Sequence, residues 1–230
     1  MKSEVYRLLQ ENGIEEKFAE KLSEYAELLE EANRHMNLTR ILSAEDMVYK
    51  HFLDSFTALK YIPENAKVID VGTGGGIPGI PLAITREDIN ITLLDATENK
   101  VNAVKGFIEK LGLKNVSAVW ARAEELAHTE LRESFDIVVS RAVASLDALT
   151  EISSGFIKLG GSFIAYKGMT AEEEAKNAEA IRKNCGLSEY KIIDATVGEF
   201  NHKLVIAEKI AELSAKYPRS WAKIKKSQKN

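Results

Sequence analysis

A glycine-rich run that begins at an acidic residue has the clearest chemical meaning in the chain. It extends from Asp70 to Gly79, follows the short apolar stretch 68–69 and leads into a helix-like segment. Glycine lets the backbone approach a ligand closely where a strand turns into a helix, because no Cβ stands in the way. A second carboxylate, Asp95, ends the next apolar run. Together these residues predict a site for a nucleotide-like cofactor.

The glycines alone leave two cofactor classes open. Gly72, Gly74 and Gly76 give the spacing G-x-G-x-G, and the last two also match G-x-G-x-x-G with Gly79. A dinucleotide places its pyrophosphate at the helix N-terminus, where a nearby negative charge is unfavourable. S-adenosylmethionine instead carries an ammonium and a sulfonium, which a carboxylate stabilises. Asp70 therefore favours S-adenosylmethionine, with an NAD(P)-dependent oxidoreductase as the alternative.

The end of the second β-rich run supplies the predicted nucleoside contacts. Asp95 can accept hydrogen bonds from both ribose hydroxyls, a role that acids at this position have in both cofactor classes. Ala96 and Thr97 would present their backbone to the nucleoside. The alternative is that Asp95 only caps the helix that begins near Thr97.

Two later strand ends extend the same predicted site. The segment 122–125, which includes Ala123 and Glu124, follows the third strand and could reach an adenine edge. Arg141 follows the fourth strand, from which a side chain can face both the reactive group of the donor and the substrate. An ion pair of Arg141 with Asp136 or Glu124 is the structural alternative.

Missing motifs narrow the reaction. No tyrosine is followed four positions later by lysine, and the chain has no Pro-Pro dipeptide, so the short-chain dehydrogenase relay and the loop of exocyclic-amine methylases are both absent. Cys185 lies far from the strand ends where a nucleophile for cytosine C5 would be placed. A ring nitrogen such as guanine N7 has an exposed lone pair and needs only alignment with the methyl group. No catalytic residue is therefore assigned.

Helical and β-rich patterns divide the chain into three parts. Residues 1–62 are expected to form an N-terminal helical appendage, with a break at Asn12 and a helix cap at Ser43. Residues 63–210 alternate β-rich and helical runs, which predicts a parallel sheet. Residues 211–230 form a basic tail. The expected strands are 67–71, 89–95, 116–120, 135–140, 162–167, 190–194 and 203–208, the last two antiparallel at one edge, with helices near Pro78, Lys100, Glu124, Leu146 and Glu173.

Composition sets the remaining limits. The 230 residues include one cysteine and four scattered histidines, which predicts neither a disulfide nor a metal site. No apolar run is long enough for a membrane span, so we expect a cytoplasmic protein without membrane contact. Residues 216–230 hold six basic residues and no acid; because the net charge is −4, the rest carries −10. A basic tail on an acidic body is typical of a polyanion partner, although a solvated terminus is equally compatible.

Candidate substrate contacts lie in the appendage and the tail. His51, Asp54 and Ser55 are spaced so that one helix face could present them to the donor pocket, or they could close the appendage onto the sheet. Asn37 lies in a polar loop, where an Asx-turn is its alternative role. Removing residues 219–230 is expected to weaken RNA binding and leave donor affinity intact. The tail candidates are Arg219, Lys223, Lys225 and Lys226.

Several segments together resemble the bacterial small-subunit ribosomal RNA guanine-N7 methyltransferases, formerly called glucose-inhibited division protein B. The similarity runs nearly end to end, but after Tyr217-Pro218-Arg219 the chain departs from the glycine and prolines found in many members. The resembling segments are 37–39, 51–55, 70–82, 94–97 with Lys100, 122–124, 140–144, 167–168 and 217–219.

The resemblance implies a class I (Rossmann-like) α/β fold, a seven-stranded mostly parallel sheet with helices on both faces. It also implies S-adenosylmethionine as the donor and a guanine in the decoding region of 16S rRNA, free or in the small ribosomal subunit, as the acceptor. We expect a monomer, with a non-catalytic ribosome assembly factor on the same fold as the alternative. The implied donor contacts are Gly72, Ile77, Asp95, Ala96, Thr97, Ala123, Glu124 and Arg141, beside Asp70 and Gly74 from the loop.

Overall fold

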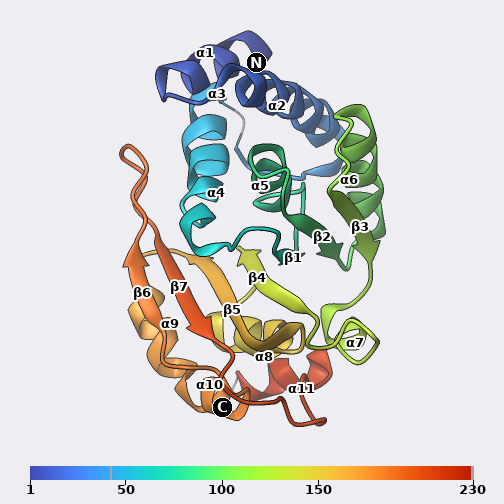
Figure 1. Cartoon of the computed structure of the whole chain (residues 1–230), viewed down its shortest axis with the longest axis vertical. Helices are drawn as coiled ribbons and strands as arrows, with labels where there is room; N and C mark the ends of the chain where they lie inside the picture. Colours follow the sequence, from blue (N-terminus) through green and yellow to red (C-terminus); the bar gives the residue numbers. More distant parts are fainter. Residues whose placement is uncertain (42, 229–230) are drawn as a thin grey trace.

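The computed structural model describes residues 1–41 and 43–228 of the chain, and within them a seven-stranded sheet forms (Figure 1). The strand order is β3-β2-β1-β4-β5-β7-β6. Strands β1 to β5 are parallel, β7 is antiparallel to β5, and β6 is antiparallel to β7. The strands are β1 (Lys67–Val71), β2 (Asn90–Asp95), β3 (Val116–Trp120), β4 (Phe135–Arg141), β5 (Ile157–Lys167), β6 (Lys191–Asp194) and β7 (Lys203–Glu208).

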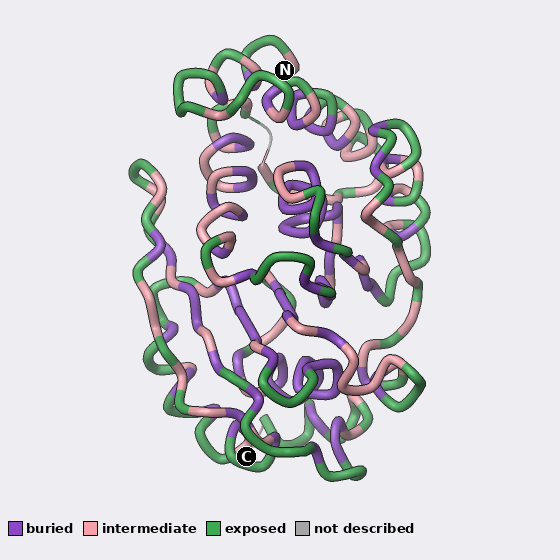
Figure 2. Tube along the Cα trace, viewed as in Figure 1, coloured by how far each residue is buried: buried purple, intermediate pink, exposed green. Residues whose placement is uncertain are grey.

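The predicted sheet is therefore confirmed, including the antiparallel pair at one edge. The central strands are nearly continuous apolar runs because both of their faces are covered by helices. Val68 and Ile69 show this directly, since the two neighbours belong to the hydrophobic cores on opposite faces of the sheet. Figure 2 shows the resulting buried colour along β1 and β4. The largest difference in bounds is at β5, which begins at Ile157 and not at Ser162.

The N-terminal helices cover one face of the sheet. Asn12 follows α1, and the Ser43 hydroxyl accepts a hydrogen bond from the Asp46 amide at 3.0 Å, so the predicted helix break and cap are confirmed. The buried residues of the N-terminal helices share one hydrophobic core with α5, α6 and the sheet. The elements of residues 1–62 are α1 (Lys2–Glu11), α2 (Glu16–Met36), α3 (Ala44–Met47), the π-helical turn η1 (Val48–Leu53), α4 (Asp54–Phe56) and the 3₁₀ turn η2 (Leu59–Tyr61).

The remaining helices complete the two layers. Helices α8 and α9 pack on the face of the sheet opposite to α2. Helix α11, in the C-terminal segment, joins the same core next to α8 (Figure 1). The helical stretch expected near Glu173 is divided into α9 and α10, and α11 was not predicted. None of the described helices is both long and apolar enough to cross a membrane. The bounds are α5 (Gly79–Thr85), α6 (Glu98–Lys110), α7 (Ala123–Leu126), α8 (Leu146–Ser154), α9 (Ala171–Asn177), α10 (Glu179–Asn184) and α11 (Trp221–Ser227).

Candidate functional site

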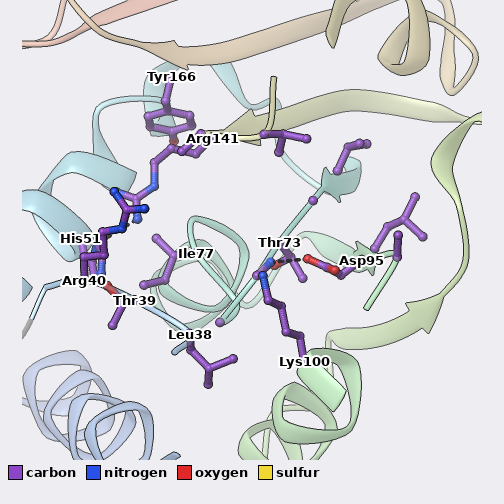
Figure 3. A pocket seen from close by; sticks show the side chains of 18 of the residues that line it. Leu38, Thr39, Arg40, His51, Thr73, Ile77, Asp95, Lys100, Arg141 and Tyr166 are labelled. Carbon is purple, nitrogen blue, oxygen red and sulfur yellow. Dashed lines mark hydrogen bonds between the residues drawn. The ribbon is translucent and has the colours of Figure 1, made fainter. Parts of the chain in front are cut away.

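A cavity of about 910 Å³ opens at the carboxyl ends of the parallel strands. Its walls come from the glycine loop after β1, the ends of β2, β4 and β5, and the segment 121–124 after β3. The loop 37–41 and the η1 turn also line it (Figure 3). The β6–β7 hairpin and α11 complete the lining. Strand β1 lies between β2 and β4, so the cavity occupies the point where the strand order reverses, the usual ligand position in such sheets.

The glycine loop exposes its backbone at the cavity wall. Gly72 and Gly74 both adopt positive φ, +75° and +59°, in the region that favours glycine. A Cβ built on Gly74 meets no atom within 4 Å, so the backbone there faces open space at the cavity wall. The Tyr25 hydroxyl of α2 donates a 2.7 Å hydrogen bond to the Gly75 carbonyl and holds the loop from behind. Ile77 also lines the cavity.

Asp70 lies behind this loop and does not line the cavity, which differs from the direct donor contact we predicted. Its Oδ2 accepts hydrogen bonds from the Thr73 hydroxyl at 2.7 Å and the Gly79 amide at 3.0 Å, while Oδ1 has no hydrogen-bond partner among the described residues. Complete burial raises the pKa of Asp70 to about 6, against the lowering effect of those hydrogen bonds. Asp70 therefore shapes the loop and can act on a bound cation only through space.

Asp95 holds the turn into α6 and also lines the cavity. Its side chain is buried at the cavity wall, where Oδ2 accepts from the Gly74 amide at 2.9 Å and Oδ1 from the Thr97 amide at 2.8 Å. The carboxylate thus fixes the turn into α6 and retains lone pairs for further donors. Ala96 lines the cavity, and its carbonyl accepts from the Trp120 indole at 3.2 Å. Thr97 is exposed and lies outside the lining.

The segment after β3 forms the wall next to Ala96. Ala123 and Glu124 both line the cavity. Arg122 donates to Glu124 Oε1 from Nε at 3.0 Å and from Nη2 at 2.9 Å, which holds the largely buried carboxylate in place. This wall therefore offers small side chains and backbone, with a charged pair at its rim.

Arg141 joins the sheet to the N-terminal helices at the other end of the cavity (Figure 3). One guanidinium nitrogen donates to the Lys50 carbonyl at 2.6 Å and to Asp54 Oδ2 at 3.1 Å, and the other lies 2.8 Å from His51 Nδ1. The alternative pairing with Asp136 or Glu124 was wrong, since those acids pair with Lys158 and Arg122. Arg141 therefore links the end of β4 to the N-terminal helices through Lys50, His51 and Asp54.

His51 is a neutral part of this junction. Burial, reinforced by the charge of Arg141, lowers the pKa of His51 to about 3. Because a guanidinium only donates, Nδ1 accepts from Arg141, and Nε2 carries the proton that it donates to Thr39 Oγ1 at 2.8 Å. Both ring nitrogens are thus engaged, which leaves His51 without a free nitrogen for general-base chemistry.

The cavity lining also includes an aromatic stack that the sequence did not reveal. The His202 ring lies between Tyr166 and Phe200, with ring centroids 6.1 and 5.4 Å away and nearly parallel planes. His202 Nε2 lies 2.9 Å from Asp54 Oδ1. The signal that could have found this stack is the antiparallel return of β7 beside β5, which brings the hairpin to the Arg141 corner.

The structure separates the predicted substrate residues of the appendage. Asn37, His51 and Asp54 line the cavity, and Asn37 ends α2 in the left-handed conformation with φ of 49°. Ser55 does not line it, because its hydroxyl donates to the His51 carbonyl at 2.6 Å within the helix. The π-helical η1 turn replaces the regular spacing on which the shared helix face was predicted.

The basic C-terminal segment is packed on the body of the protein. Arg219 donates from Nη2 to Glu151 Oε2 at 2.6 Å, and Glu151 is buried in α8, so this arginine anchors the segment. Lys223, Lys225 and Lys226 are exposed on α11, and Lys229 lies outside the described residues. In the described ranges, no group of three or more histidine, cysteine or acidic side chains is arranged to hold a metal ion.

Comparison with known proteins gives a consistent result. The family described as rRNA small subunit methyltransferase G matches residues 18–202. The ribosomal RNA small subunit methyltransferase G of Clostridium botulinum strain Alaska E43 is 44% identical over 215 residues, covering 90% of this chain and 89% of the relative. Its counterpart from Clostridium perfringens strain 13 is 43% identical over 210 residues, covering 88% and 87%.

Solved structures show the same fold at lower identity. A SAM dependent methyltransferase from Aquifex aeolicus has a TM-score of 0.54 at 22% identity and covers 69% of this chain and 91% of its own. The TYW2 protein of M. jannaschii in complex with AdoMet has a TM-score of 0.57 at 18% identity, covering 74% and 80%. The class I fold expected from the sequence is therefore confirmed.

Proposed function

Because the chain belongs to the rRNA small subunit methyltransferase G family, we propose that it transfers a methyl group from S-adenosylmethionine to N7 of a guanine in the decoding region of 16S rRNA. The observation that carries this proposal is one continuous cavity that joins a nucleoside-binding set around Asp95 to a buried polar corner around Arg141. Its volume of about 910 Å³ lies near the upper end of the usual range for ligand sites, about 300 to 1,000 Å³. Donor and acceptor base can therefore occupy it together.

The donor end is assigned from the residues that line it. In this assignment Asp95 accepts hydrogen bonds from the ribose hydroxyls, Ala123 and Glu124 flank the adenine, and Gly72 and Gly74 lie beside the methionine part; the support is that all five residues line the cavity. When bound, S-adenosylmethionine supplies an electrophilic methyl group on its sulfonium. The orphaned Oδ1 of Asp70 behind the loop fits a positively charged ligand in front of it.

The acceptor end is assigned to the corner formed by Arg141, His51, Asp54 and the aromatic stack. Guanine N7 needs no deprotonation, so this corner has only to orient the base toward the methyl group. The neutral, fully engaged His51 agrees with that requirement. We also expect the protein to act as a monomer. We place the protein in the cytoplasm, where the small ribosomal subunit is assembled.

The direct test is methyl transfer from labelled S-adenosylmethionine to small-subunit RNA that lacks the modification. Free 16S rRNA, assembly intermediates and complete small subunits should be compared side by side, with label expected at a guanine N7. Label at a different atom would contradict the assignment. Binding of subunits without methyl transfer to any of the three would instead indicate a non-catalytic assembly factor.

We expect Asp95→Ala to weaken S-adenosylmethionine binding by about 1 to 3 kcal/mol, because the ribose hydroxyls and the Gly74 and Thr97 amides lose their acceptor. Isothermal titration calorimetry measures the change. The matched control is Asp88→Ala, which removes a carboxylate paired with Arg86 on the surface and outside the cavity. Equal donor affinity in the two variants would place the donor elsewhere.

Donor affinity is also expected to rise with pH through about 6. Below this pH the Asp70 carboxyl of the free protein is protonated, and a bound cation favours the ionised form. Donor binding then releases a proton, so affinity increases roughly tenfold between pH 5 and 7 and levels off above. Calorimetry across this range checks the slope. Asp70→Asn keeps an acceptor for Thr73 and Gly79 and should give a flat profile; a flat wild-type profile would refute the role of Asp70.

A further inference from the structure

The C-terminal segment is fixed on the body of the protein beyond the part matched by the family, which ends at residue 202. The Arg132 guanidinium donates to the Tyr217 carbonyl at 2.9 Å, and the Arg219 pair with Glu151 adds a second anchor. Ile224 of α11 is buried in the core that α8 forms with the sheet. Helix α11 therefore has a defined position, even though the sequence there departs from the resembling family.

That position puts Trp221, the first residue of α11, in the wall of the cavity. The Arg122 guanidinium carbon lies 5.7 Å from the centroid of its ring, and Lys225 Nζ lies 5.6 Å from it. Arg122 is in turn held by Glu124, which lines the cavity beside Ala123. The indole thus lies near two cations and next to the residues assigned to the adenine.

We propose that Trp221 is a donor-binding residue, which closes the adenine end of the S-adenosylmethionine site with its indole. The proposal rests on the donor assignment made above. An indole face removes apolar ligand surface from water and can stack on a purine. The pairing of Arg122 with Glu124 fixes the cation beside the indole and so limits the movement of the Trp221 ring. The C-terminal helix then completes the donor site, contrary to the expectation that residues 219–230 can be removed without loss of donor affinity.

The first experiment follows the fluorescence of Trp221 itself. The chain has two tryptophans, so Trp120→Phe leaves Trp221 as the only emitter. Titration with S-adenosylmethionine, and separately with S-adenosylhomocysteine, should change its emission with the same Kd that calorimetry gives for this variant. If calorimetry detects donor binding while the emission stays constant, Trp221 does not contact the donor and the proposal is wrong. If calorimetry detects no donor binding, the proposed function fails with it.

The second experiment measures the energetic contribution of the ring. Trp221→Ala should weaken donor binding about tenfold, and Trp221→Phe, which keeps an aromatic face, should recover most of it. Gln228→Ala is the control for a loosened helix, because it removes the α11 contact with Ser145 away from the cavity and should leave donor affinity unchanged. Equal losses in Trp221→Ala and Gln228→Ala would show that α11 acts only through general packing, and would overturn the proposal.

Discussion

Replacing Arg141 by alanine is expected to lower the free energy of unfolding by about 3 to 5 kcal/mol. The Asp54 side chain is only 2% exposed, and the Arg141 side chain 18%, so the substitution leaves a buried carboxylate without its guanidinium partner. It also removes donors from the Lys50 carbonyl and from His51 Nδ1. Urea unfolding at neutral pH measures the loss.

The cause can be isolated with two further variants. Arg34→Ala is the control, because the Arg34 side chain is exposed and its ion pair with Glu30, at 3.6 Å, is a surface pair. The free energy of unfolding should therefore be unchanged. Asp54→Asn in the Arg141→Ala background removes the stranded charge and should recover part of the stability. Failure of this second change to recover any stability would show that the unpaired Asp54 is not the cause.

Gly72→Val is expected to reduce S-adenosylmethionine affinity by roughly a hundredfold or more. A β-branched residue strongly disfavours the φ of +75° at this position, which costs about 1 to 3 kcal/mol. Its Cβ would in addition lie 2.3 Å from Val143 Cγ2, so the loop or the segment after β4 must shift at the cavity wall. The new side chain therefore collides with Val143, which also lines the cavity, and this collision changes the shape of the glycine loop at the donor site.

Gly13→Val separates the two contributions. Gly13 has φ of +77°, but a Cβ there meets no atom within 4 Å, and it lies outside the cavity. This variant should lose stability through backbone strain alone and keep its donor affinity. Calorimetry on both folded proteins gives the comparison, and a Gly72→Val protein that binds donor as the wild type does would remove the loop from the site.

Features encoded by neighbouring residues could be predicted from the sequence. The strands, the glycine turn after β1 and Asp95 at the end of β2 all follow from local apolar runs and residue types, and the structure places them in one sheet edge. The parallel order also predicts that the ends of β2, β3 and β4 meet there. This part of the site depends on the topology alone.

Contacts between distant segments could not be read in the same way. The pairing of Arg141 with Asp54 spans 87 positions and that of Arg219 with Glu151 spans 68, and nothing local to either arginine specifies its partner. Asp70 has the residue type expected of a donor contact, but its burial depends on how α5 packs over the loop. The same limit applies to His202, whose place depends on the edge hairpin.

The hydrophobic core shared by the N-terminal helices and the sheet makes them one cooperative folding unit. Its buried members run from Val5 in α1 to Leu204 in β7 without division at residue 62. Amide hydrogen exchange in the middle of α2 should therefore be as slow as in β1, because neither can open without exposing the other. Limited proteolysis should accordingly release no folded fragment of residues 1–62, and the donor loop, tied to α2 through Tyr25, should lose its shape only when the whole molecule unfolds.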